Sequence, residues 1–120
     1  MPDVRATLVN SNPKEISEEV WAEICFELFN IVLANSPVDT GEYLANWQLN
    51  RLADDIWELY NPLEYASFLE DGWSGQAPNG VVGPAIDELP GILRGYLGRK
   101  PKGDVYVTLE VPDYEPKAKS

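Results

Sequence analysis

One segment, residues 13–35, has the apolar spacing of a long helix and limits the possible folds more than any other part of the chain. Asn12 suits the N-cap and Pro13 the first helical position, and Pro37 ends the helix because the residue before a proline avoids helical dihedrals. The apolar side chains cover about half of the circumference; they are Val20, Trp21, Ile24, Cys25, Leu28, Phe29, Ile31 and Val32. We therefore expect the helix to pack on two sides.

The same helix is expected to carry an acidic row at four-residue spacing, made of Glu15, Glu19, Glu23 and Glu27. Like charges at this spacing destabilise a helix by about 0.2–0.5 kcal/mol per pair, which a solvated face tolerates. The first interpretation is therefore a face in contact with water. The second is contact with Lys or Arg of another subunit, which makes these four residues candidate interface residues.

Three segments have the composition of strands. Residues 4–9 and 54–61 are rich in β-branched and aromatic side chains, and Pro62 ends the second segment because it has no N–H to donate. Residues 104–111 alternate apolar and polar side chains, which indicates a strand buried on one face.

A second helix is expected to begin at Asp39 or Thr40, with Glu42 reaching back to the cap residue as in a capping box. Tyr43, Leu44 and Trp47 follow at helical spacing, so we expect them in the core and only secondarily as a binding face.

Two further helical segments are expected downstream. Residues 63–71 form one or two turns that end at Gly72. Residues 83–98 have helical spacing, but Pro90 and Gly91 fall in the middle, so this helix is expected to kink or break there.

The elements together predict a single α+β domain over residues 1–111. It contains a small, mainly antiparallel sheet, with the long N-terminal helix and two or three further helices packed on it. Residues 112–120 are expected to form a flexible C-terminal tail.

The composition argues against several classes of function. Twenty acidic and nine basic residues give a formal net charge of −11, so a surface that binds nucleic acid is not expected. The chain has no histidine, the usual general base and metal ligand. The single Cys25 indicates a reducing, cytosolic compartment, and no segment has the pattern of an export signal or a membrane span.

Acidic pairs such as Glu70 with Asp71 raise the possibility of a carboxylate hydrolase. A pair alone is weak support, and a small sheet leaves little room for a sugar groove. We expect no catalytic residue, no metal site and no cofactor.

The loop at residues 72–80 is rich in glycine and turn-forming residues, and it carries the large aromatic Trp73. This side chain either packs back on the core or anchors an interface. The candidate interface residues of the loop are Trp73, Gln76, Ala77, Pro78 and Gly80.

Two segments, SPVDTGEYLANW and NPLEYASFLEDGWSGQAPNG, together resemble the neck and tail-completion family of long-tailed bacteriophages, which includes minor tail proteins of the Z type. The first matches the family pattern P-x-D-T-G-x-L-x-x-S-W at Pro37, Asp39, Thr40, Gly41 and Trp47, with Leu44 directly after the aliphatic position, which Tyr43 occupies. The second matches N-x-x-x-Y-A-x-x-x-E-x-G, followed by Q-A-P-x-G, at Asn61, Tyr65, Ala66, Glu70, Gly72, Gln76, Ala77, Pro78 and Gly80. Glu42, Tyr43 and Asn46 depart from the residues common in the family.

The resemblance implies a virion structural protein that assembles in the host cytoplasm as a ring, a hexamer, in the neck or tail. Its partners would be further copies of itself, the connector or head-closure proteins, and the tail terminator or tail tube. DNA would pass through the lumen without specific binding, and no catalytic role is implied. The residues alone leave an alternative, a small acidic cytosolic protein that binds and inhibits a basic partner.

Overall fold

The sheet has four strands, and every neighbouring pair is antiparallel. The computed structural model describes residues 3–36, 45–63, 66 and 80–111. The strand order is β2-β3-β1-β4, in which β1 is Val4–Asn10, β2 is Gln48–Ala53, β3 is Ile56–Asn61 and β4 is Val105–Glu110. The strands predicted at residues 4–9, 54–61 and 104–111 are confirmed.

The first strand, β1, lies at the centre of the sheet because alternate side chains fit a buried face. Val4, Ala6 and Leu8 are at most 1% exposed, and the residues between them are half-buried. Leu59 of β3 pairs with Ala6 and is also fully buried. One face of the sheet is therefore the floor of the core.

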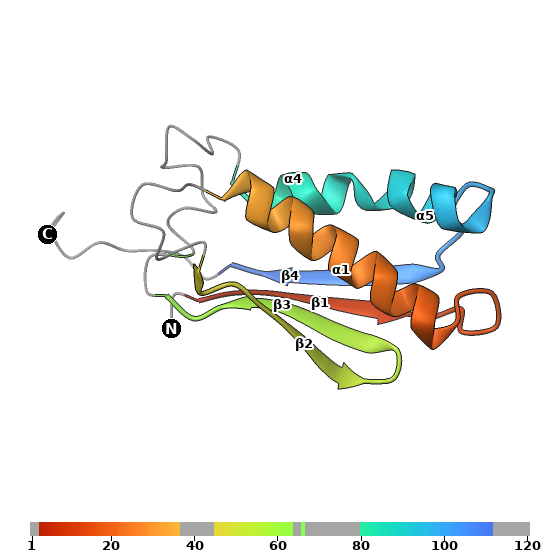
Figure 1. Ribbon diagram of the computed structural model, residues 1–120, viewed down its shortest axis with the longest axis horizontal. Helices are drawn as coiled ribbons and strands as arrows, with labels where there is room; N and C mark the ends of the chain where they lie inside the picture. Colours follow the sequence, from red (N-terminus) through yellow and green to blue (C-terminus); the bar gives the residue numbers. More distant parts are fainter. Residues whose placement is uncertain (1–2, 37–44, 64–65, 67–79, 112–120) are drawn as a thin grey trace, which may run out of the picture.

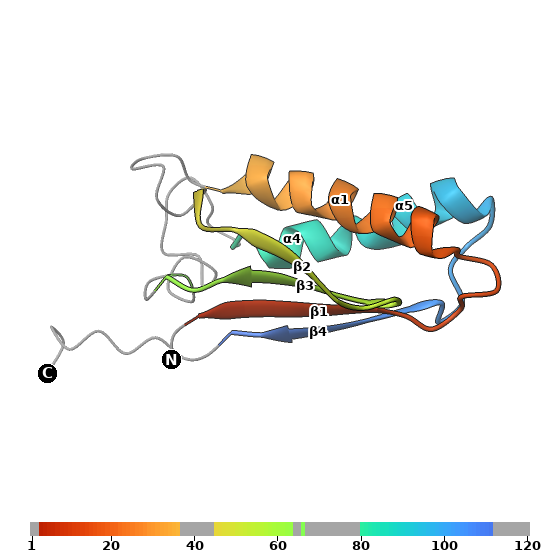
Figure 2. The ribbon, with the colours of Figure 1, turned by 60° about the horizontal axis from the view of Figure 1, so that its bottom comes forward.

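The helices cover this one face of the sheet (Figures 1 and 2). They are α1, Glu18–Asn35, and the short pair α4, Val82–Asp87, and α5, Leu89–Leu97. The opposite face of the sheet points away from the helices (Figure 2), and no other described element covers it. The α+β class predicted from the sequence is confirmed.

The long helix α1 packs on two sides, as its wide apolar arc predicts. Trp21, Ile24 and Leu28 are fully buried, and Ile31 lies at the border of the core. The second side faces α4 and α5 of the same chain (Figure 1), so it is already occupied within the subunit.

The start of α1 differs from the prediction. Its N-cap is Ser17, whose hydroxyl oxygen accepts a hydrogen bond from the amide of Val20 at 3.2 Å, whereas the sequence favours Asn12. Residues 13–15 form a separate turn. The amide nitrogen of the Asn12 side chain donates to Asp104 and Glu15 and so does not cap the helix.

The prediction of the second helix is wrong at its C-terminal end. Trp47 lies outside any helix, and β2 begins directly after it at Gln48. Trp47 is 6% exposed, which confirms its place in the core. The predicted helix start at Asp39 or Thr40 lies outside the described residues.

The break predicted near Pro90 is confirmed, although it lies two residues earlier. α4 ends before Glu88, and Pro90 occupies the first turn of α5, where its missing N–H has no intrahelical partner to lose. Gly98 ends α5 at φ 71°, a left-handed conformation that favours glycine.

Candidate functional site

The described residues of the two motif-bearing segments, residues 36–47 and 61–80, are parts of the fold and not an exposed site. The indole nitrogen of Trp47 donates to the Ser36 hydroxyl at 2.9 Å, and that hydroxyl donates to the carbonyl of Val32 at 2.7 Å. Trp47 therefore fixes the chain just before β2 against the C-terminal end of α1. These contacts lie at the end of the molecule away from the N-cap of α1 (Figure 1).

Asn61 and Ala66 build the turn that follows β3. Asn61 is fully buried, and its side-chain oxygen accepts a hydrogen bond from the amide of Leu63 at 3.1 Å. The amide of Ala66, also fully buried, donates to the carbonyl of Leu63 at 3.0 Å. The first of these bonds is an Asx turn, which asparagine forms well because its short side chain mimics the backbone.

Gly80, predicted as an interface residue, is buried and has φ 85°, so its role is to shape the entry into α4. The remaining residues singled out in the two segments lie outside the described residues: Pro37, Asp39, Thr40, Gly41, Leu44, Tyr65, Glu70, Gly72, Trp73, Gln76, Ala77 and Pro78.

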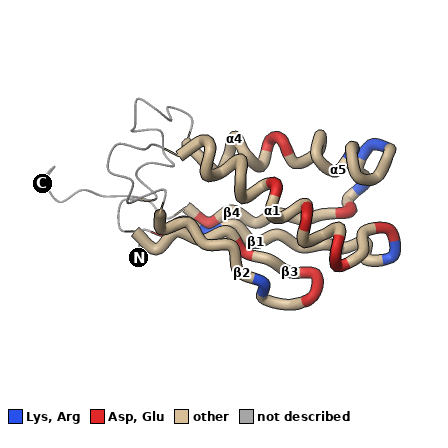
Figure 3. The backbone as a smooth tube through the Cα atoms, viewed as in Figure 1, with Lys and Arg blue, Asp and Glu red and all other residues tan. Residues whose placement is uncertain are grey.

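The acidic row predicted on one helix is divided in the structure. Glu15 precedes α1 and pairs with Arg99 of the loop after α5. Glu19, Glu23 and Glu27 lie exposed on α1 (Figure 3). Among the described residues of this one chain, these three carboxylates form no ion pair with a base, so they are free for either interpretation, and contact with another subunit stays a prediction.

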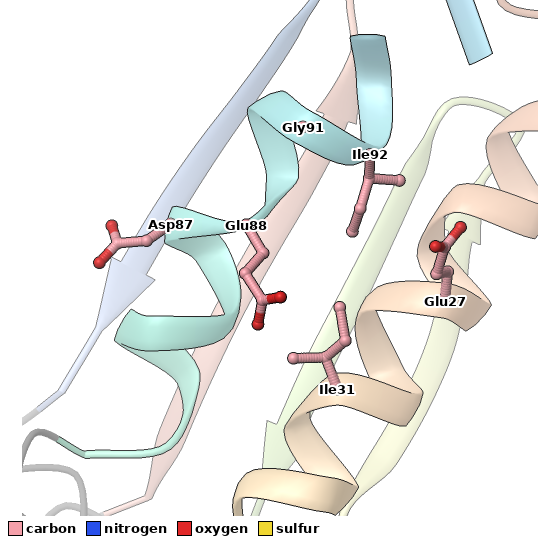
Figure 4. A pocket seen from close by; sticks show the side chains of 6 residues that line it. All are labelled: Glu27, Ile31, Asp87, Glu88, Gly91 and Ile92. Carbon is pink, nitrogen blue, oxygen red and sulfur yellow. The ribbon is translucent and has the colours of Figure 1, made fainter. Parts of the chain in front are cut away.

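Glu27 belongs to a shallow hollow between α1 and the α4–α5 pair, with a volume of about 420 Å³. The lining residues are Glu27, Ile31, Asp87, Glu88, Gly91 and Ile92. Figure 4 shows Glu88 and the two isoleucines directed into the gap, whereas Asp87 points away from α1. The hollow is open, and its lining combines acidic and apolar side chains.

Tyr96 of α5 lies close to Glu27, and its pKa is raised by the negative charge beside this hollow. Burial raises the pKa of its hydroxyl, and the charge of Glu27, a hydrogen bond to Glu27 and the charge of Glu23 raise that pKa further. The potential therefore suits a cationic group better than an anionic one.

A cluster of charged and amide side chains closes the opposite end of the fold, around the N-cap of α1. The guanidinium of Arg99 donates to both carboxylate oxygens of Asp104, at 2.9 and 3.2 Å, and also to Glu15. Asn12 donates to Asp104 at 2.7 Å, and the amide of Lys102 donates to its other oxygen at 2.7 Å. We call this group the Arg99 cluster: Asn12, Glu15, Arg99, Asp104 and the Lys102 amide.

The electrostatics of the Arg99 cluster suit a structural role. Hydrogen bonds from Arg99, the Lys102 amide and Asn12 hold the pKa of Asp104 well below its ordinary value of 3.8. Arg99 and Asn12 also lower the pKa of Glu15, and the two carboxylates raise the pKa of Arg99. A general acid needs a raised carboxyl pKa, and here both carboxylates are held ionised.

The sequence does not predict the Arg99 cluster, because Glu15 and Arg99 are 84 positions apart. The available signal is the single acid, Asp104, that follows the basic stretch RKPKG. An acid after a basic stretch is equally typical of a solvated loop, so this signal does not identify Glu15 or Asn12 as partners.

No other chemistry emerges from the described residues. The thiol of Cys25 is fully buried, and burial raises its pKa, so it is a poor nucleophile. Within residues 3–36, 45–63, 66 and 80–111, no group of three or more potential ligand side chains is placed to hold a metal ion. No helix in the same ranges combines the length and apolar character that a bilayer crossing requires.

Comparisons of this chain with protein-family models, with curated proteins and with solved structures found no match.

Proposed function

We propose that this chain is a virion structural protein, a subunit of the neck or tail-completion ring of a long-tailed bacteriophage. It would join the portal-side connector to the tail tube and leave a channel for DNA. The observation that carries the proposal is the pair of family-like segments, which occur in the expected order around the β2–β3 hairpin. Four of their positions, Trp47, Asn61, Ala66 and Gly80, are buried residues that shape the fold.

The surface chemistry supports a structural role in contact with passing DNA. The chain has a net charge of −11, and acids are spread along α1 and the loops (Figure 3). Phosphate groups are repelled by such a surface, so DNA would slide past it without binding.

The proposal is tested on particles purified by density gradient from cells that carry the gene. Mass spectrometry is expected to find the chain in complete virions, and electron cryomicroscopy is expected to place it as a ring at the head–tail junction. The control is a strain with an early stop codon in the gene, which should give filled heads and separate tails. Complete, infectious virions from the stop-codon strain would reject the proposal.

A second candidate function, binding of a basic partner, is favoured by the acidic hollow between α1 and α4–α5. Glu27 and Glu88 supply acidic side chains to its lining, and Ile31 and Ile92 supply apolar ones. A pull-down from lysate at low salt should then capture a basic protein that salt releases. Glu88→Gln should weaken this capture, and Glu19→Gln, outside the hollow, should not.

A further inference from the structure

The two edge strands of the sheet expose an unusual amount of apolar surface. Among the described residues, five large hydrophobic side chains are exposed, and three of them lie on edge strands. Leu52 of β2 is 55% exposed, and Tyr106 and Leu109 of β4 are 62% and 38% exposed. Edge strands therefore concentrate the apolar surface that the helices leave uncovered.

These edges also lack the devices that keep sheets from pairing with each other. Proteins block an edge with Lys, Pro or inward-pointing charges, because its unpaired N–H and C=O groups can bind another strand. The sequence of β4 is VYVTLE, with no Lys or Pro and one charge at its end. In β2, QLNRLA, the single charge of Arg51 is neutralised by Asp54 at 2.8 Å.

The topology makes the two edges complementary to each other. All neighbouring strands are antiparallel in the order β2-β3-β1-β4, so the two edge strands run in opposite directions. A second copy placed beside the first in the same orientation brings its β4 antiparallel to β2. In one copy the helices lie on one side of the sheet (Figure 2), so in this arrangement the helices of both copies would lie on the same side of one continuous sheet.

The cross-strand rows continue across such a junction with matching chemistry. One row runs Asn50, Glu58, Thr7, Thr108, and the next on the helix side runs Leu49, Leu59, Ala6, Leu109. In the same register, Leu49 of one copy lies opposite Leu109 of the next, and Asn50 lies opposite Thr108. Apolar side chains meet on the helix side, and polar side chains meet on the open side.

Charge is complementary at one end of the junction. Ala53 and Tyr106 share a row through Ile56 and Val9, so the turn after β2 would lie beside the loop before β4 of the next copy. The turn carries Asp55 and also Asp54, which already pairs with Arg51 of the same chain, and that loop carries exposed Lys100 and Lys102 (Figure 3). Neither lysine ammonium forms an ion pair with a described residue.

We infer that copies of this chain assemble by pairing β4 of one subunit, antiparallel, with β2 of the next. Two-fold pairing of β4 with β4 would leave every β2 edge unpaired, whereas pairing β4 with β2 uses both edges and repeats until a ring closes. This inference rests on the proposed function, because it names the contact by which the neck ring would form.

Cysteine pairs test the contact directly. Within one chain, Asn50 and Thr108 are separated by three strand spacings, about 14 Å, which no disulfide spans. The double variant Asn50→Cys with Thr108→Cys should therefore form only intermolecular disulfides on mild oxidation, seen as a ladder of multimers on a non-reducing gel. Pairing Asn50→Cys with Tyr106→Cys or Glu110→Cys captures a shift of two residues in register.

The single variants separate the possible arrangements. On a non-reducing gel, Asn50→Cys alone and Thr108→Cys alone should each run as a monomer, because neither junction then carries two cysteines. An equimolar mixture of these two variants should give covalent dimers and nothing larger. The matched control, Asn50→Cys with Thr7→Cys, places its second cysteine on the central strand of the same row and should not cross-link. Thermal melts under reducing conditions confirm that each variant is folded.

Three outcomes overturn the inference. Dimers from Thr108→Cys alone mean two-fold pairing of β4, and dimers from Asn50→Cys alone mean two-fold pairing of β2. Absence of cross-links in all three double variants means that the edges do not pair. If the double variant forms covalent multimers but the protein is absent from virions, the neck role is rejected and the contact stands. If virions contain a ring of the protein but the cross-links do not form, the contact is rejected and the neck role stands.

Discussion

The two faces of the sheet are stabilised differently although the same strands form both of them. On the covered face Val4, Ala6 and Leu59 are fully buried beneath the helices. On the open face Arg5 forms an ion pair with Glu58 at 3.1 Å and lies over the ring of Tyr60 at 4.8 Å. The covered face holds the fold together by close packing, whereas the open face needs only side chains that water and a neighbour tolerate.

The largest expected effect is a difference in the free energy of unfolding between substitutions at two adjacent residues of β1, one on each face of the sheet. Leu8→Ala is expected to lower the free energy of unfolding by about 2–5 kcal/mol, because it leaves a cavity under the helices. Val9→Ala, on the open face, should lower it by about 1 kcal/mol or less. Urea denaturation measures both. Equal losses would mean that the open face is packed as tightly as the covered one.

The Arg99 cluster, beside the N-cap of α1, gives the next largest effect. The pKa of Asp104 is lower in the folded chain than its ordinary value of 3.8. Its contribution to stability is therefore complete above that value and is lost as the pH falls below it. Asp104→Asn should lower the melting temperature at pH 7 and flatten the fall in stability below about pH 4. A variant with the same acid unfolding curve as the parent would assign the pH dependence to other carboxylates, such as Glu15.

The open face itself should respond weakly to loss of a charge. Glu58→Gln removes the ion pair with Arg5, and partly exposed pairs contribute about 0–1 kcal/mol. The loss should shrink further in concentrated salt, because salt screens the pair in the parent protein. Denaturation at two salt concentrations measures this, and a loss that salt does not change would indicate packing by Glu58.

The solvent side of α1 should show the smallest change in stability. Glu27→Gln is expected to alter the free energy of unfolding by no more than about 0.5 kcal/mol. It should nevertheless lower the pKa of Tyr96, because the charge and the hydrogen bond of Glu27 both raise it. Ultraviolet titration of tyrosine follows that shift, with Glu19→Gln as the matched control. An unchanged titration would leave burial and the charge of Glu23 as the causes of the raised pKa.

The covered face is largely predictable from sequence, because periodicity reports burial. The alternation in β1 and β4 indicates both strands, and the apolar arc of α1 indicates the helix that covers them. Trp47 lies in the core as predicted, but outside any helix, so the helical spacing behind that prediction is not the cause of its burial.

The errors occur where distant partners decide the local structure. Asn12 has every local property of an N-cap, yet its side chain is taken by Asp104, which is 92 positions away. The sequence of β2, QLNRLA, has little apolar periodicity, and it becomes a strand because β3 offers it an edge. Among the candidate site residues, the sequence predicts that Trp47 is structural but gives no sign that Arg99 joins Glu15 to Asp104.

The central position of β1 has a consequence for how the chain matures on the ribosome. Arg5 pairs with Glu110, so the first strand to be made cannot complete its hydrogen bonds until the last one emerges. At roughly 5–20 residues per second, about 5–20 s pass between the synthesis of β1 and that of β4, and during this time β1 has no β4 partner. Contacts of such long sequence separation also slow folding. The nascent chain therefore spends its whole synthesis with an incomplete sheet, and truncation before β4 should yield a species that chaperones retain.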